Sequence, residues 1–203
     1  AQLSRGLGDV YKRQELKAEL LRQSAEVIEI PCIINGVEVY TDNVVEQVMP
    51  HNHSHVIARV HMAGEQEVNN AINAALSAHK NWSTMPWEAR AAIFLKASEL
   101  LKGEYRAKIN ASTMINQSKT CHQAEIDSAC ELIDFWRFNV QYAREIYEDL
   151  QPPVSPSSMW NSSEVRPLEG FVFSVTPFNF SSIAANLPSS AAIMGNTGAV
   201  SYT

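Results

Sequence analysis

The stretch from Glu169 to Thr197 constrains the fold of this chain most, because its hydrophobic pattern changes from that of a strand to that of a helix. The run "GFVFSVT" is short and nearly all apolar, which is typical of a strand buried in a parallel sheet. "TPFNF" then forms a turn, and "SSIAANLPSSAAIMG" is a helical segment rich in small residues. This order of strand, turn and helix predicts an α/β fold. Small residues let a helix approach either a sheet or a ligand, and the pattern leaves both open.

Asn179 lies just past the carboxyl end of this strand, two residues after Pro177. Open α/β sheets place their ligands at that end of the strands. The amide could therefore donate its side-chain N–H to an oxyanion, a role whose loss typically costs about 100- to 1000-fold in rate. It could equally cap the helix that follows. The residues by themselves support both roles.

Helical spacing of apolar residues recurs in four stretches upstream. They cover residues 65–82, 86–103, 104–116 and 122–148. In the last of them, the apolar residues from Ala129 to Ile146 fall along one face. We therefore expect four helices that could pack together.

Two strand pairs are predicted before these helices. The first covers residues 26–41 and turns at Asn35-Gly36, and the second lies around Pro50. Three alternating histidines follow Pro50 and could share one face of a strand: His51, His53 and His55. No fourth ligand stands at a supporting spacing, so we expect exposed histidines and no metal site.

Composition excludes several classes of function. The chain has 203 residues, 45% of them hydrophobic, and a formal net charge of -6. It contains no block of Lys and Arg to follow a phosphate backbone, and no run of roughly 20 apolar residues to span a bilayer. Nucleic acid and membrane are therefore not expected partners. The cysteines, Cys32, Cys121 and Cys130, lack the spacings of disulfide frameworks, zinc sites or nucleophile motifs, and indicate structural thiols in a reducing compartment.

Several motifs resemble the aldehyde dehydrogenase superfamily. "EGFVFSVTPFNF" and "MGNT" are similar to the start of its cofactor-binding domain, although no G-x-G-x-x-G is present. "KTCHQAEIDSACELIDFWRFNVQYA" is more selective and resembles the long helix of the Δ1-pyrroline-5-carboxylate dehydrogenase branch, as do "EIPC", "EARAAIFLKASELL" and "PLEGFV". The resemblance extends over residues 26–199.

The resemblance implies an enzyme that oxidises glutamate γ-semialdehyde to glutamate with NAD, in proline breakdown. It implies a mitochondrial matrix location in a eukaryote and a cytoplasmic one in a bacterium, and a homo-oligomer for the full-length protein. Asn179 would be the catalytic oxyanion donor. Thr176, Pro177 and Phe178 would line the cofactor and Phe180 the aldehyde pocket. Glu131 would face the substrate's amino group, unless it is only a solvated helix charge.

The chain also departs from the family pattern. Position 201 holds serine where the resemblance implies a lysine for the cofactor ribose, and the catalytic cysteine and general base would lie beyond Thr203. We therefore expect a truncated amino-terminal part of the aldehyde dehydrogenase fold, inactive by itself. The alternatives are a naturally short, non-catalytic partner of a full-length dehydrogenase and another branch of the superfamily.

The expected division of the chain follows from these departures. Residues 1–14 lack an amphipathic period and are predicted to be foreign or disordered, and residues 15–150 to form the strands and helices that open the cofactor-binding domain. Residues 151–168, rich in proline and serine, are predicted to be a connection or an oligomerisation hairpin. Residues 169–199 would be the first strand-turn-helix of the NAD-binding core, and residues 200–203 foreign.

Overall fold

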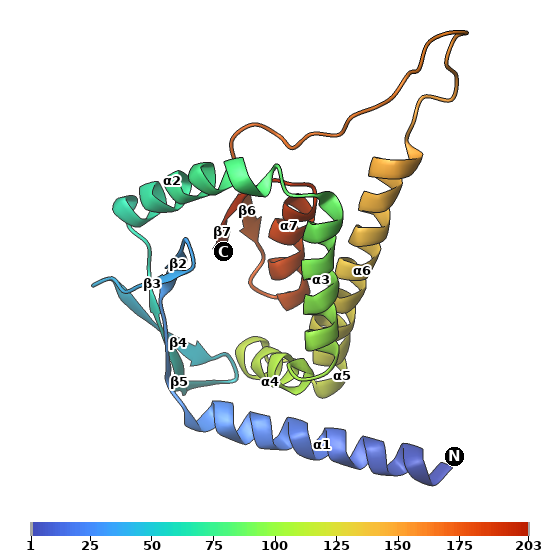
Figure 1. Ribbon diagram of the computed structural model, residues 1–203. Coiled ribbons are helices and arrows are strands. Elements are labelled where there is room, and N and C mark those ends of the chain that lie inside the picture. The colour runs from blue at the N-terminus through green and yellow to red at the C-terminus, as the bar shows by residue number, and fades with distance from the viewer. Residues whose placement is uncertain (1, 203) are drawn as a thin grey trace.

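The structure is a computed structural model that describes residues 2–202, and the side chains of residues 12–201. Helices form most of it, and small groups of strands lie beside them (Figure 1). In chain order the elements are α1 (Gln2–Ala25), β1 (Ile28–Ile30), β2 (Cys32–Ile34), β3 (Val37–Val39), β4 (Val44–Met49), β5 (Asn52–His61), α2 (Glu65–Trp82), α3 (Trp87–Lys102), α4 (Arg106–Gln117), α5 (Cys121–Ala124), the π-helical turn η1 (Glu125–Cys130), α6 (Glu131–Arg144), the π-helical turn η2 (Glu145–Asp149), β6 (Val172–Thr176), α7 (Ser181–Ile193) and β7 (Gly198–Tyr202).

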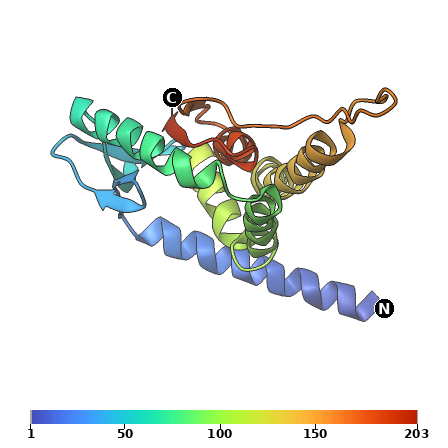
Figure 2. The same cartoon turned by 45° about the horizontal axis from the view of Figure 1, so that its top comes forward.

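The opening of the chain is helical, in contrast to the disorder considered for residues 1–14. Helix α1 runs from Gln2 to Ala25 and packs against α4, and Gln23 Nε2 donates to Lys108 O at 3.0 Å. In Figures 1 and 2 this helix lies along one side of the molecule. Charge pairs one turn apart, such as Arg22 with Glu19 and Glu26, support the end of this helix. That residues 1–14 are foreign to the gene stays a prediction.

The predicted hairpin and strand pair are confirmed, with one difference. Strands β2 and β3 are antiparallel, and Asn35 and Gly36 turn with φ of 53° and 75°. Strands β4 and β5 pair in the same antiparallel way around Pro50. Strand β1, however, pairs in parallel with β5 and not with β3. Pro31 separates β1 from β2 and has no N–H to continue a ladder, so the two short strands belong to different sheets.

All four predicted helices are present as α2, α3, α4 and the long helix that begins at Cys121. This long helix contains two π-helical turns, η1 and η2, which the apolar spacing did not reveal. A π-helical turn holds one extra residue, so it rotates the faces of the helix on either side of it. Leu132 and Ile133 of α6 pack with Leu101 of α3, and Trp136 and Ala185 adjoin them.

Helix α2 buries less than its pattern predicted. Ala75 is buried, whereas Val68 and Leu76 remain 50% and 46% exposed. Its packing partners in the described residues include the short strands β2 and β7, and Trp82 Nε1 at its end donates to Ala192 O of α7 at 2.9 Å. Such short strands cannot cover the whole apolar stripe of an 18-residue helix.

The predicted strand, turn and helix at the end of the chain are β6 and α7, and β7 follows them. β6 and β7 are parallel and in register from Val172↔Gly198 to Thr176↔Tyr202. The strand therefore continues past Ala199, the last residue of the predicted strand-turn-helix of the NAD-binding core. That residues 200–203 are foreign stays a prediction.

The expectation that β6 is buried is wrong for one of its faces. Ser174 and Thr176 are buried, whereas Phe173 and Val175 are 60% and 50% exposed. Helix α7, which also packs on α6 and α3, covers only one face of the strand pair. The small polar residues of β6 lie on the buried face, and its large apolar residues lie on the open one.

Candidate functional site

The loop between β6 and α7 presents Asn179 at the carboxyl end of β6. Thr176, the last residue of β6, is fully buried, and its Oγ1 donates to Ser201 O of β7 at 3.4 Å. Beyond it Pro177 is half-buried, Phe178 is 76% exposed and Asn179 is exposed. The backbone therefore leaves the sheet at Thr176 and carries the next residues outward.

Asn179 does not cap α7. The N-cap residue of α7 is Phe180, and no side chain provides a capping hydrogen bond. Among residues 12–201, no hydrogen bond of the Asn179 amide side chain is found, so its N–H groups are available to a ligand. The capping alternative is thus excluded. The oxyanion role stays a prediction, since it requires a substrate.

Lys119 holds the backbone of this loop from the segment between α4 and α5. Its Nζ donates to Asn179 O at 2.6 Å and lies 4.1 Å from the ring centroid of Phe180. The same ammonium pairs with Asp127 Oδ2 of η1 at 2.8 Å. Sequence reasoning missed Lys119, because a lysine just before a helix gives no sign of a partner 60 residues further along the chain.

Glu131 also reaches the same end of the β6–α7 unit. Its Oε2 accepts a hydrogen bond of 2.7 Å from Ser182 Oγ, and Ser182 is fully buried in the first turn of α7. A carboxylate at a helix N-terminus is favoured by the exposed N–H groups and the helix dipole. Glu131 is therefore half-buried and bonded, so it is not merely a solvated helix charge. The predicted substrate contact is not tested by this arrangement.

Helix α4 completes the attachment of this end of α7. Ser181 Oγ lies 3.0 Å from Thr113 Oγ1 and accepts a hydrogen bond of 3.0 Å from Gln117 Nε2. Ser181 and Ser182 are thus tied to two different helices. Asn179 and Phe180, the two residues before them, contact Lys119.

An ionic network lies beneath η1. Arg106 pairs with Glu125, and the other carboxylate oxygen of Glu125 accepts from Asn110. Burial raises the pKa of Glu125, but the hydrogen bonds from Arg106 and Asn110 outweigh it, and the net pKa lies below its ordinary value. Glu125 is therefore held as a carboxylate. The network ties α4 to the long helix, whose Asp127 pairs with Lys119 and whose Glu131 bonds Ser182 of α7.

Cys130 and Cys32 have the character of structural thiols. Burial raises the pKa of Cys130, and the neighbouring charge of Glu125 raises it further. Burial and the charge of Glu67 raise the pKa of Cys32 in the same way. A raised pKa disfavours the nucleophilic thiolate. Cys121 is exposed.

The three alternating histidines do not share one site. His51 Nδ1 lies 2.8 Å from Ser118 Oγ, whereas His55 Nε2 lies 2.8 Å from Ser24 O. Within the part of the chain that the structure describes, no group of three or more His, Cys, Asp or Glu side chains could hold a metal ion.

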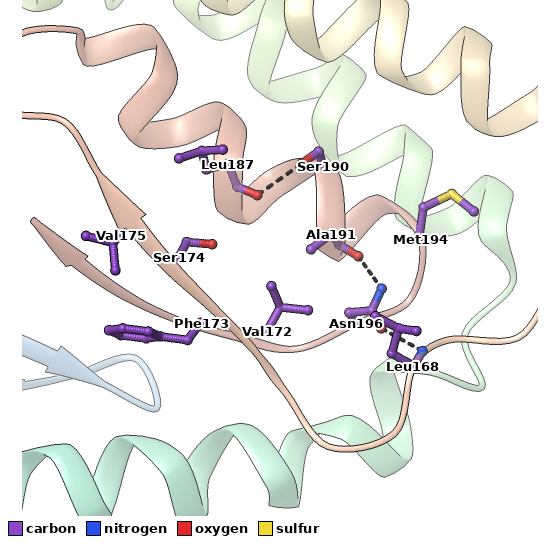
Figure 3. Close-up of a pocket in the computed structure, with 10 residues that line it drawn as sticks. All are labelled: Leu168, Val172, Phe173, Ser174, Val175, Leu187, Ser190, Ala191, Met194 and Asn196. Atoms are coloured by element: carbon purple, nitrogen blue, oxygen red, sulfur yellow. Dashed lines mark hydrogen bonds between the residues drawn. The ribbon is translucent and has the colours of Figure 1, made fainter.

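An open groove of about 580 Å³ follows the free edge of β6 and the adjacent side of α7 (Figure 3). Its lining is mostly apolar, and the polar side chains of Asn196 and Ser190 are already bonded within the chain. Asn196 Nδ2 donates to Ala191 O, Asn196 Oδ1 accepts from Leu168 N, and Ser190 Oγ donates to Leu187 O. These bonds make the groove a packing surface beside the candidate site.

None of the described helices is long and apolar enough to cross a membrane.

Comparison with known proteins gives consistent matches over most of the chain. A family model described as "Aldehyde dehydrogenase family" matches residues 38–200. The chain is 49% identical over 186 residues to the Delta-1-pyrroline-5-carboxylate dehydrogenase of Agaricus bisporus, covering 91% of this chain and 34% of that protein. It is 46% identical over 185 residues to the mitochondrial Delta-1-pyrroline-5-carboxylate dehydrogenase of Homo sapiens, covering 91% of this chain and 32% of the human protein.

A solved structure agrees with these relatives. The Delta-pyrroline-5-carboxylate dehydrogenase of Mycobacterium tuberculosis bound with NAD superposes with a TM-score of 0.90 at 46% identity, covering 92% of this chain and 35% of that one. The chain thus spans about a third of the length of the relatives it matches.

Proposed function

The chain belongs to the aldehyde dehydrogenase family, and we propose that the complete protein containing it oxidises glutamate γ-semialdehyde to glutamate with NAD. The semialdehyde is in equilibrium with 1-pyrroline-5-carboxylate, the compound in the names of the relatives. The observation that carries the proposal is that Glu131 bonds Ser182, three residues after Asn179, so that Glu131 and Asn179 both lie at the end of the β6–α7 unit where β6 passes into α7. The reaction needs a donor for the aldehyde oxygen and an acceptor for the substrate ammonium, and these two side chains supply them.

Asn179 acts on the aldehyde oxygen in this proposal. As a nucleophile adds to the carbonyl carbon, negative charge develops on that oxygen, and an amide N–H of Asn179 can donate to it. The backbone of Asn179 is already fixed through its carbonyl, so the amide needs little reorganisation at the moment of reaction. The resemblance implies that the nucleophilic cysteine and the general base come from parts of the protein outside these 203 residues.

Glu131 and Phe180 recognise the substrate in this proposal. A half-buried carboxylate facing an ammonium gives a charge-assisted hydrogen bond, and the second oxygen of Glu131 is free of Ser182. One face of the Phe180 ring contacts Lys119, and the opposite face can line the aldehyde pocket. Together they favour a short aldehyde that carries a positive charge.

The carboxyl edge of β6 and β7 fits a dinucleotide. Parallel strands with a crossover helix place a ligand at this edge, and Pro177 and Phe178 project from it. The buried side chain of Thr176 would shape the site by its position in the strand. Ser201 offers a hydroxyl where a lysine would hold the ribose. When bound, NAD supplies the hydride acceptor. We place the enzyme in the mitochondrial matrix, because the names of the human and Dictyostelium discoideum relatives call those proteins mitochondrial, or in the cytoplasm of a bacterium.

The test of Asn179 uses the complete enzyme and follows NADH formation with glutamate γ-semialdehyde. Asn179→Ala should lower kcat by about 100- to 1000-fold, because the oxyanion loses its donor. Asn81→Ala, at an exposed position of α2, is the matched control and should retain wild-type rates. A loss of less than about threefold in the Asn179 variant would exclude the oxyanion role.

The test of Glu131 separates substrate recognition from support of α7. Glu131→Gln keeps an oxygen that can accept from Ser182 but removes the charge that faces the ammonium. The variant should raise KM for glutamate γ-semialdehyde by about 10-fold or more and leave KM for propionaldehyde, which has no ammonium, unchanged. Equal changes for both aldehydes would favour another branch of the family.

We also propose that the complete protein is a homo-oligomer joined through the segment of residues 151–168. This segment leaves the body of the molecule as a long arm (Figure 1). Three apolar residues of this segment, Val154, Met159 and Trp160, are 72%, 70% and 90% exposed. Hydrogen bonds within the segment, such as the one from Asn161 N to Ser155 Oγ, order its turn. Trp160→Ser should shift the protein to a smaller species in sedimentation, and an unchanged mass would exclude this contact.

A further inference from the structure

We propose that Lys119 is a positioning residue that holds the oxyanion-donor loop, residues 177–180, in its reactive geometry. The inference rests on the proposed oxyanion role of Asn179 and extends it to a residue outside the β6–α7 unit. Lys119 does not touch the reacting atoms in this proposal. It acts through the backbone of Asn179 and the ring of Phe180.

The first support is the number and kind of contacts that converge on one ammonium group. Its Nζ donates to Asn179 O at 2.6 Å, lies 4.1 Å from the Phe180 ring centroid and pairs with Asp127 Oδ2 at 2.8 Å. The side chain is only 14% exposed, and that of Asp127 only 22%. A shielded ammonium interacts more strongly with a carbonyl and a ring than an exposed one does.

The second support is the division of labour among the contacts at this end of α7. Ser181 is held by Thr113 and Gln117, and Ser182 is held by Glu131. The first turn of α7 is therefore anchored without Lys119. Removal of the ammonium should loosen residues 177–180 and leave the helix and the rest of the fold in place.

The third support is that the amide of Asn179 has no partner of its own among the described side chains. Its reach therefore depends on where its own Cα atom lies, and Lys119 holds the peptide that follows this Cα atom through the carbonyl oxygen. A donor shifted by as little as about 1 Å can cost roughly 100-fold in rate. Fixing this carbonyl is thus a direct way to keep the amide on target.

The kinetic test compares three variants of the complete enzyme. Lys119→Met keeps the length of the side chain but removes the charge and all donors, and it should lower kcat by about 10- to 100-fold. Lys119→Arg restores a cation that can donate to the carbonyl and stack on the ring, and it should recover at least a third of wild-type kcat. Lys102→Met, at an exposed position of α3, is the matched control and should leave kcat unchanged.

A positioning role also predicts which constants stay the same. KM for NAD should remain within about twofold of wild type in Lys119→Met, since the loop reorients a donor used in the chemical step. A general loss of stability would instead lower activity in proportion to the folded fraction, and Lys119→Arg would not selectively restore kcat. An unchanged kcat in Lys119→Met would overturn the proposal.

Hydrogen exchange tests the same inference without any catalysis. The amide of Ala184 donates to Phe180 O at 3.1 Å, so its exchange reports how firmly the loop is held. Lys119→Met should speed exchange in the peptide containing residues 177–184 by about 10-fold, and Lys119→Arg and Lys102→Met should not. If the wild-type enzyme proves inactive on the semialdehyde, the proposed function fails, and exchange still decides whether Lys119 holds the loop. Equal exchange in all variants would overturn the inference.

Discussion

Replacing Arg90 by methionine should loosen the attachment of α7 to the helical part of the chain. Arg90 of α3 is only 2% exposed, and its guanidinium donates to three acceptors outside α3, two of which are far away in the chain. Its Nε donates to Ile193 O at 3.0 Å, Nη2 to Tyr147 Oη at 2.9 Å, and Nη1 to Met85 O. Ile193 is the last residue of α7, where the helix dipole favours a cation.

The magnitude follows from these three bonds. Methionine fills much of the same volume but donates nothing, so the carbonyls of Ile193 and Met85 lose their partner in buried surroundings. Each unsatisfied buried acceptor costs about 1–3 kcal/mol. Water can reach some of this region in the variant, so we expect a loss of about 3–5 kcal/mol in the local free energy of opening. That is a large part of the 5–15 kcal/mol that typically stabilises a domain.

Hydrogen exchange of the complete protein measures this loss locally. The amides of Gly195 and Asn196, which donate to Ala192 O and Ala191 O, should exchange at least about 100-fold faster in Arg90→Met. Arg144→Met is the control, because Arg144 is exposed and solvent screens its pair with Glu148. A change of less than about fivefold in Arg90→Met would refute the view that this guanidinium joins the two parts.

Three further predictions concern the rest of the fold. Hydrogen bonds from Arg106 and Asn110 lower the pKa of Glu125, so the Glu125 carboxylate stabilises the fold above about pH 4.5, and this stabilisation is lost as the pH falls through the folded-state pKa. Glu125→Gln should remove this part of the acid dependence in denaturation curves and cost about 1–2 kcal/mol at pH 7. Gly195→Ala should cost about 2–4 kcal/mol in urea unfolding, because its φ is +89° and a Cβ would lie 2.7 Å from Pro167 Cγ. Gly170→Ala, with φ of +81° and nothing within 4 Å, should cost only about 1 kcal/mol. Iodoacetamide labelling mapped by mass spectrometry should modify Cys121 well before Cys130, whose pKa burial raises; equal rates would contradict the assignment of Cys130 as a shielded thiol.

Local patterns in the sequence predicted the element types well. The four helices, the hairpin at Asn35-Gly36 and the pair of strand and helix after Gly170 were all confirmed. Each of these depends on a period of 2 or 3.6 residues or on a turn that needs a positive φ, and neighbouring residues determine both. The helical opening was missed because residues 1–14 have no apolar period. Charge pairs and packing on α4 support this helix instead.

The candidate site was predictable in part. Asn179 was proposed because it follows a strand end, and Glu131 was proposed through the resemblance. Whether Asn179 capped the helix could not be decided from residue types, since an asparagine serves either role at that position. Only the geometry of α7, with Phe180 as its N-cap, removed that alternative.

The sequence by itself determined where helices and strands form, which family the chain resembles and which residues could carry the chemistry. The tertiary structure alone decided that Lys119 holds Asn179, that Arg90 ties α3 to the end of α7, and that β6 buries Ser174 and Thr176 while it exposes Phe173. The physical reason is the range of the interactions. Secondary structure follows from residues a few positions apart, whereas these contacts join residues 60 or 103 positions apart and exist only after the elements have packed.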